Sequence, residues 1–169
     1  MDDFLLRLTL NDVEYGTGEL TVSAQANNFS GQSSAYFHLE EIVQFASALN
    51  AYPLPREGFP HLAGGYWKRK GHETEHHSAI IVHSIGQEQN SLLYELEQEH
   101  VSITVYPVGF VGRIGIQVKL LLPFDERNRP EDRFAVQLEI GTTYQQLGEF
   151  SKDLIHLASG EFHETVLLI

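Results

Sequence analysis

Short segments in which apolar and polar residues alternate recur along this 169-residue chain, and they constrain its fold more than any other feature. In the first segment, Phe4 to Leu10, every second residue is apolar. A period of two is typical of a β-strand that buries one face. Gly16-Thr17-Gly18 is predicted to be the turn that follows it. Alternation, or an apolar run between turn residues, predicts further strands at 20–26, 35–39, 66–67, 79–85, 92–96, 101–105, 114–122, 134–140 and 162–169.

Two segments have the period of a helix instead. Residues 39–50 place apolar side chains at spacings of three and four, and prolines follow soon after. Residues 143–159 repeat this spacing after a capping-box pair and before Gly160. Many hairpin-connected strands with two isolated helices predict an α+β fold with a largely antiparallel, twisted sheet. The length predicts a single domain, residues 1–169.

One strand prediction contains an internal conflict. Glu95, Glu97 and Glu99 occupy odd positions, as do the aliphatic residues of 101–105. An uninterrupted strand would place these charges and these aliphatic side chains on the same face. The sequence therefore predicts a turn or a β-bulge near Gln98.

The charge balance indicates which partners the chain can bind. There are 23 acidic and 11 basic residues, a net charge of −12 with histidines neutral. Nucleic-acid binding requires a basic patch, and the basic run here is 68–70, so nucleic acid is not expected as a partner. An acidic surface attracts a basic protein instead. The candidate contacts to such a partner are Glu95, Glu97, Glu99, Asp125 and Glu126.

Cysteine usage and hydropathy limit the cellular setting. The chain has no cysteine, which excludes disulfides, thiolate metal sites and a cysteine nucleophile. It has no apolar run of about 18 residues and no basic segment at its start, so neither a membrane span nor a secretory signal is expected. We expect a cytoplasmic protein.

Residues 72–76 read His-Glu-Thr-Glu-His and match the zinc-hydrolase motif H-E-x-x-H. On a helix, His72 and His76 would share one zinc ion, and Glu73 would act as general base. The surroundings favour the solvated tip of a hairpin instead, because no aliphatic residue lies between 68 and 78 and a glycine precedes the motif. No cofactor is expected. The candidate metal ligands are His72, His76 and His77.

Three segments resemble those of a small bacterial family. They are 29–45, with the run Ala-Tyr-Phe-His-Leu-Glu-Glu, 113–118, with Arg-Ile-Gly-Ile-Gln-Val, and 134–150, with Thr-Tyr-Gln-Gln-Leu-Gly-Glu-Phe. In this order they resemble the strand and helix modules of the WapI-type immunity proteins and related bacterial domains. The resemblance implies a small cytoplasmic protein that binds and neutralises a toxin, and it brings no catalytic residue with it.

Three functions remain open at this point. The first is a non-enzymatic protein-binding domain, by resemblance an immunity protein that occludes the active site of a basic toxin domain. The second is a metal-dependent hydrolase that uses residues 72–76. The third is an oligomeric structural or regulatory domain, in which edge strands or the apolar segment 166–169 pair across a homodimer.

Overall fold

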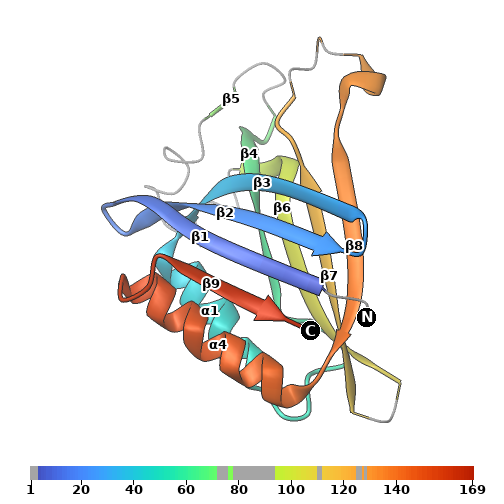
Figure 1. Cartoon of the computed structure of the whole chain (residues 1–169). Coiled ribbons are helices and arrows are strands. Elements are labelled where there is room, and N and C mark those ends of the chain that lie inside the picture. Colours follow the sequence, from blue (N-terminus) through green and yellow to red (C-terminus); the bar gives the residue numbers. More distant parts are fainter. Residues whose placement is uncertain (1–3, 72–75, 78–93, 110–111, 125–126, 128) are drawn as a thin grey trace.

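The computed structural model describes residues 4–71, 76–77, 94–109, 112–124, 127 and 129–169. Within these ranges it contains two antiparallel sheets and two α-helices, which confirms the α+β fold (Figure 1). Sheet A has the order β3-β2-β1-β9. Its strands are β1 (Phe4–Glu14), β2 (Thr17–Ala26), β3 (Phe29–His38) and β9 (Glu164–Leu168).

Sheet B has the order β5-β4-β6-β7-β8, and the strands of sheet A cross over it in Figure 1. A short 3-10 helix, η1 (Pro130–Asp132), lies between β7 and β8. The strands of sheet B are β4 (His61–Arg69), β5 (His76–His77), β6 (Tyr94–Val108), β7 (Arg113–Leu121) and β8 (Ala135–Thr142).

The alternating residues supply the core between the sheets. Leu6, Leu8 and Val22 of sheet A are fully buried, and so are Ile103 and Val118 of sheet B. Each such side chain contributes about 1.5–3 kcal/mol when it is removed from water. The period of two therefore identifies the inward faces of both sheets correctly.

β3 begins at Phe29, whereas the sequence predicted a start at Ala35. The early part of β3 does not alternate in hydropathy because its inward residues, Gly31 and Ser33, are small. Small residues are required here, since a Cβ on Gly31 would collide with the side chain of Val136 on β8. The close approach of the two sheets thus hides this part of the strand from a hydropathy pattern.

Both helices occur where they were predicted, and they pack against each other beside sheet A (Figure 1). α1 spans Leu39–Leu49 and α4 spans Tyr144–Ser159. The Ser151 hydroxyl on α4 donates to the Ala46 carbonyl on α1 at 2.6 Å. The capping box at the start of α4 is present, and Gly160 ends the helix with a left-handed φ of 81°.

The predicted irregularity near Gln98 is confirmed as two bulges. The pairing of β4 with β6 skips His100 and, three residues earlier, Glu97. The bulges change which residues face inward, so Gln98 and His100 are buried as well as the odd positions from Val101 onward. One continuous strand therefore accommodates both halves of the conflicting pattern. The predicted strand 79–85 lies outside the described residues.

Candidate functional site

The end of the β1–β2 hairpin combines acidic side chains with an exposed aromatic ring. Its turn consists of Tyr15 and Gly16, with φ values of 50° and 80°, rather than the predicted Gly16-Thr17-Gly18. Two left-handed residues are the pattern of a type I′ turn, whose twist matches the flanking strands. The Tyr15 side chain is fully exposed, and Asp12 and Glu14 precede it on β1.

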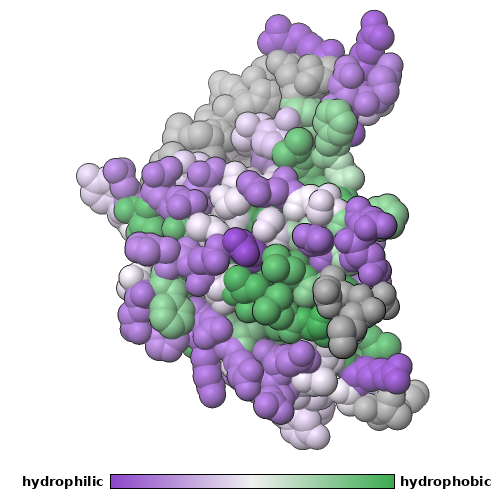
Figure 2. Space-filling model, viewed as in Figure 1, coloured by the Kyte–Doolittle hydropathy of each residue, from purple (hydrophilic) through white to green (hydrophobic). Residues whose placement is uncertain are grey.

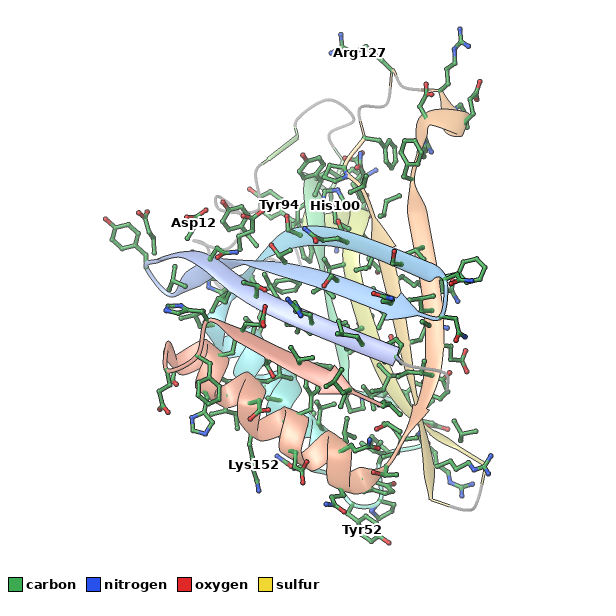
Figure 3. All side chains as sticks on the ribbon, viewed as in Figure 1. Asp12, Tyr52, Tyr94, His100, Arg127 and Lys152 are labelled. Atoms are coloured by element: carbon green, nitrogen blue, oxygen red, sulfur yellow. The ribbon has the colours of Figure 1, made fainter. Side chains whose placement is uncertain are left out.

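Together with burial, three carboxylates of this region raise the pKa of one tyrosine, Tyr36. Glu19 lies opposite Tyr36 in the β2–β3 register and accepts a hydrogen bond from the Ser34 hydroxyl at 2.6 Å. The pKa of Tyr36 is raised, first by burial and then by the negative charges of Glu19, Asp12 and Glu14. The β1–β2 register, which pairs Asn11 with Glu19 and Glu14 with Thr17, places the three acids at this end of sheet A. Figure 3 shows Asp12 there, on the side of the molecule away from Lys152 of α4.

The predicted acids of β6 have different surroundings. The Lys68 ammonium on β4 lies 3.3 Å from a carboxylate oxygen of Glu95 and 4.0 Å from one of Glu97. The side chain of Glu97 is only 15% exposed, and Glu99 is half-buried. Glu95 and Glu97 are therefore partly neutralised by Lys68. The other predicted contacts, Asp125 and Glu126, lie outside the described residues.

The candidate metal ligands are only partly placed. His76 and His77 form β5, where they pair with Lys68 and Trp67 of β4 as one side of a hairpin. Their extended backbone is not the helix on which the H-E-x-x-H mechanism depends. His72 and Glu73 lie outside the described residues, so the metal site stays a prediction. Among the residues that are described, no group of three or more His, Asp or Glu side chains is arranged to hold a metal ion.

A buried polar cluster on β6 was not predicted from the sequence. The Gln98 amide donates to the Phe124 carbonyl at 2.8 Å, and its oxygen accepts from the Phe124 N–H at 3.3 Å. The same oxygen lies 3.2 Å from Nε2 of His100, which also has a backbone hydrogen bond with Ser34 of β3. Burial lowers the pKa of His100, and the bond to Ser34 partly offsets this effect. The cluster links sheet B to sheet A and has a structural role.

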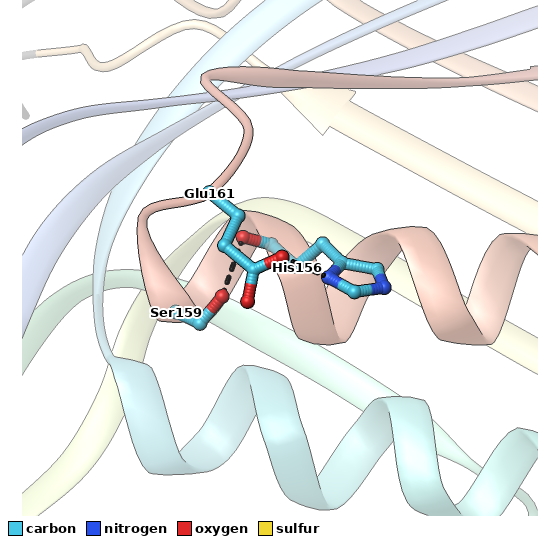
Figure 4. A network of polar contacts seen from close by, with 3 residues as sticks. All are labelled: His156, Ser159 and Glu161. Atoms are coloured by element: carbon cyan, nitrogen blue, oxygen red, sulfur yellow. Dashed lines mark hydrogen bonds and ion pairs between the residues drawn. The ribbon is translucent and has the colours of Figure 1, made fainter.

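The end of α4 contains a serine, a histidine and a glutamate close together (Figure 4). Nδ1 of His156 lies 2.7 Å from a carboxylate oxygen of Glu161. The Ser159 hydroxyl, however, donates to the main-chain carbonyl of His156 at 2.9 Å and not to the imidazole. A hydrolytic triad requires the hydroxyl to bond to the imidazole, so these contacts close the helix end instead.

A cleft of about 600 Å³ lies between α1 and β4. Its walls are mainly apolar, with Phe45, Phe59 and Leu96 among them. Two of its polar side chains have bonds within the fold: Glu41 accepts from the His38 N–H at 2.8 Å, and His61 contacts Thr104 at 2.9 Å. The cleft is therefore a mainly apolar hollow in which Glu41 and His61 are already engaged within the fold.

The apolar surface is also uneven. On the face drawn in Figure 2, an apolar patch interrupts the hydrophilic surface near the ends of β1 and β9. The β1–β9 register places Leu5 beside Leu168, which is 65% exposed, and Arg7 beside Val166. An ion pair of 3.3 Å between Arg7 and Glu164 lies on the same pair of strands.

Comparisons of the chain with protein-family models, with curated proteins and with solved structures found no match. No helix within the described ranges is long and apolar enough to cross a membrane.

Proposed function

We propose that this chain is a non-enzymatic protein-binding domain that docks on a basic partner protein. The docking site is the hairpin surface, which consists of Asp12, Glu14, Tyr15, Glu19 and Tyr36. The observation that carries the proposal is the grouping of three carboxylates around the half-buried Tyr36, next to the exposed Tyr15 at the end of a paired hairpin.

Charge and shape both support this assignment. Clustered carboxylates steer a basic partner toward the surface and accelerate association. Tyrosine is among the residues that dominate binding energy when an interface buries them. Tyr15 is fully exposed, and it has a left-handed backbone that is unfavourable for a bulky side chain. Residues held in such conformations occur more often at functional sites, where the strain has a purpose.

The partner that fits best is a basic toxin domain, which the chain would neutralise by covering its active site. Two features support this choice: the net charge of −12 and the resemblance of three segments to immunity proteins. The mechanism requires no reaction on this chain. It requires only that the complex dissociates too slowly for the substrate to reach the active site of the toxin.

The test is co-expression with the protein encoded by the adjacent gene, followed by co-purification over a series of salt concentrations. Two charge variants with equal net charge are compared with the natural chain. The hairpin variant carries Asp12→Asn, Glu14→Gln and Glu19→Gln. The matched control carries Glu95→Gln, Glu97→Gln and Glu99→Gln.

We expect the natural chain and the control to retain the partner at low salt and to protect the cells. The hairpin variant should bind about tenfold more weakly or worse, which corresponds to about 1.4 kcal/mol. Equal losses in both variants would show that net charge, and not the hairpin surface, drives binding. If no partner is retained at low salt and the toxin stays lethal, the immunity function is wrong.

A further inference from the structure

One edge of sheet B has no cover among the described residues. β8 pairs with β7 alone, and that register runs without a bulge from Ala135 to Thr142. The strand contains neither proline nor lysine, and its single charge is Glu139. Natural proteins usually protect an edge strand with such residues or with a bulge, because its outer N–H and C=O groups can pair with another chain.

The single charge of β8 is engaged within its own sheet. Tyr106 of β6 forms a side-chain hydrogen bond with Glu139, with its ring over Gly115 of β7. The edge of sheet A at β9 provides a contrast, since α4 runs alongside it. There the Gln146 side chain donates to the Leu168 carbonyl at 3.4 Å.

β3 shows where a further strand would lie. Its inward residues cross sheet B strand by strand: Phe37 lies against Gly64 of β4, the Ser33 hydroxyl donates to the Leu121 carbonyl of β7 at 2.7 Å, and Gly31 lies against Val136 of β8. Phe29 has the same parity and is the next inward position.

Among the strands that the structure describes, none lies beneath Phe29. Its side chain is 70% exposed although it belongs to the inward face of sheet A. In Figure 1 the end of the β2–β3 hairpin reaches across β8, which is the last strand of sheet B. The Phe29 side chain therefore lies above the position that one more strand beside β8 would occupy.

We propose that an extended segment of a partner protein adds to sheet B as a strand along β8, beneath Phe29. Its residues on the inner face are apolar and continue the row of Val136, Leu138 and Ile140. Its residues on the outer face are polar, because they adjoin Gln137 and Glu139. Main-chain hydrogen bonds supply the affinity and the alternating side chains supply the specificity.

A partner segment fits this edge better than a second copy of the chain. In a two-fold arrangement that pairs β8 with β8, the strand beneath Phe29 would be β8 of the other copy, which β3 of that copy already covers where Gly31 lies against Val136. A single extended segment carries no such cover. The proposal extends the proposed function but uses other residues than the hairpin surface, so each can fail without the other.

The experiment uses a labelled ten-residue peptide that alternates valine with lysine or threonine. Its control has the same side chains, but alternate backbone nitrogens are methylated, which removes donors without changing the charge. Hydrogen exchange of the β8 amides and fluorescence anisotropy are measured with the full chain. We expect the first peptide to slow exchange within residues 135–142 by about tenfold and the methylated peptide to have no effect.

Two variants test the role of the Phe29 side chain in binding the peptide. Phe29→Ala should weaken binding of the first peptide by about tenfold. Tyr15→Ala, which removes another exposed ring from sheet A, should leave this binding unchanged. Equal protection by both peptides, or unchanged binding after Phe29→Ala, would overturn the proposal. A third outcome would also overturn it: light scattering shows that the chain is a dimer, and Phe29→Asp dissociates this dimer. A second copy would then occupy the edge of β8.

Discussion

Two acidic regions of this molecule use their charges differently. On β6, Glu95 and Glu97 surround the ammonium of Lys68, next to a segment that turns Gln98 and His100 into the interior. At the β1–β2 end, Asp12, Glu14 and Glu19 act together on Tyr36. The first region uses charge to complete the fold, and the second presents charge to solvent. The number of acids therefore does not identify a docking surface. The residues that surround the acids identify it.

The largest effect is expected where β4 meets the bulges of β6. A Cβ on Gly65 would collide with the Gln98 carbonyl oxygen. Gly65→Ala should therefore lower the free energy of unfolding by about 3 kcal/mol, measured by chemical denaturation. The control is Gly148→Ala in α4, where a Cβ meets only an ordinary contact and should stabilise the helix by about 0.5–1 kcal/mol. Equal changes at both sites would contradict this account of the bulges.

The next effect concerns the polar cluster that the bulges bury. Gln98→Ala removes the partner of both main-chain groups of Phe124 and of the His100 ring. We expect a loss of about 2 kcal/mol in the free energy of unfolding. Gln137→Ala on the exposed face of β8 serves as the control, with a change below about 0.5 kcal/mol. A neutral Gln98→Ala would mean that the cluster does not link the sheets.

The same cluster predicts a dependence of stability on pH. Burial lowers the pKa of His100 in the folded chain below its ordinary value of 6.5. As the pH falls, His100 is protonated in the unfolded chain before it is protonated in the folded chain. The contribution of His100 to the free energy of unfolding is therefore complete above about pH 6.5 and is lost as the pH drops toward the folded pKa. His100→Gln should reduce this slope when denaturation is measured between pH 7 and the folded pKa. An unchanged slope would assign the effect to the other histidines.

At the hairpin end we expect a small gain in stability together with a loss of binding. Asparagine tolerates the left-handed backbone of Tyr15 better than tyrosine does, and Asn-Gly is the favoured pair in a type I′ turn. Tyr15→Asn should raise the free energy of unfolding by less than about 1 kcal/mol while it weakens the complex with the basic partner. Thermal denaturation and anisotropy measure the two quantities. A destabilised variant that binds normally would show that Tyr15 serves the fold.

Much of the fold could be predicted from the sequence because long stretches have one clear period. Phe4 to Leu10 and the helices at 39–50 and 143–159 bury a continuous stripe, and the conflict at Gln98 indicated the bulges. The start of β3 was missed because Gly31 and Ser33 face inward without being apolar. The close approach of another sheet has no signature in a local pattern.

The hairpin surface could not be predicted in the same way. Asp12 and Glu14 are separated from Glu19 and Tyr36 by the turn, and only the strand register brings them together. The one available signal was the Tyr-Gly pair at 15–16, which is unusual in a tight turn. Glu95, Glu97 and Glu99 were predicted as partner contacts because they lie close together in the sequence. No local pattern shows that Lys68 pairs opposite Glu95.

The most direct test of the docking claim is oxidative footprinting of tyrosine side chains in the complex with the basic partner. Tyr15 and Tyr52 are both strongly exposed, at 102% and 82%, but they belong to different regions of the molecule. We predict that labelling of Tyr15 falls by about tenfold in the complex while that of Tyr52 is unchanged. A complex that protects Tyr52 and leaves Tyr15 fully reactive would contradict the assignment of the hairpin surface.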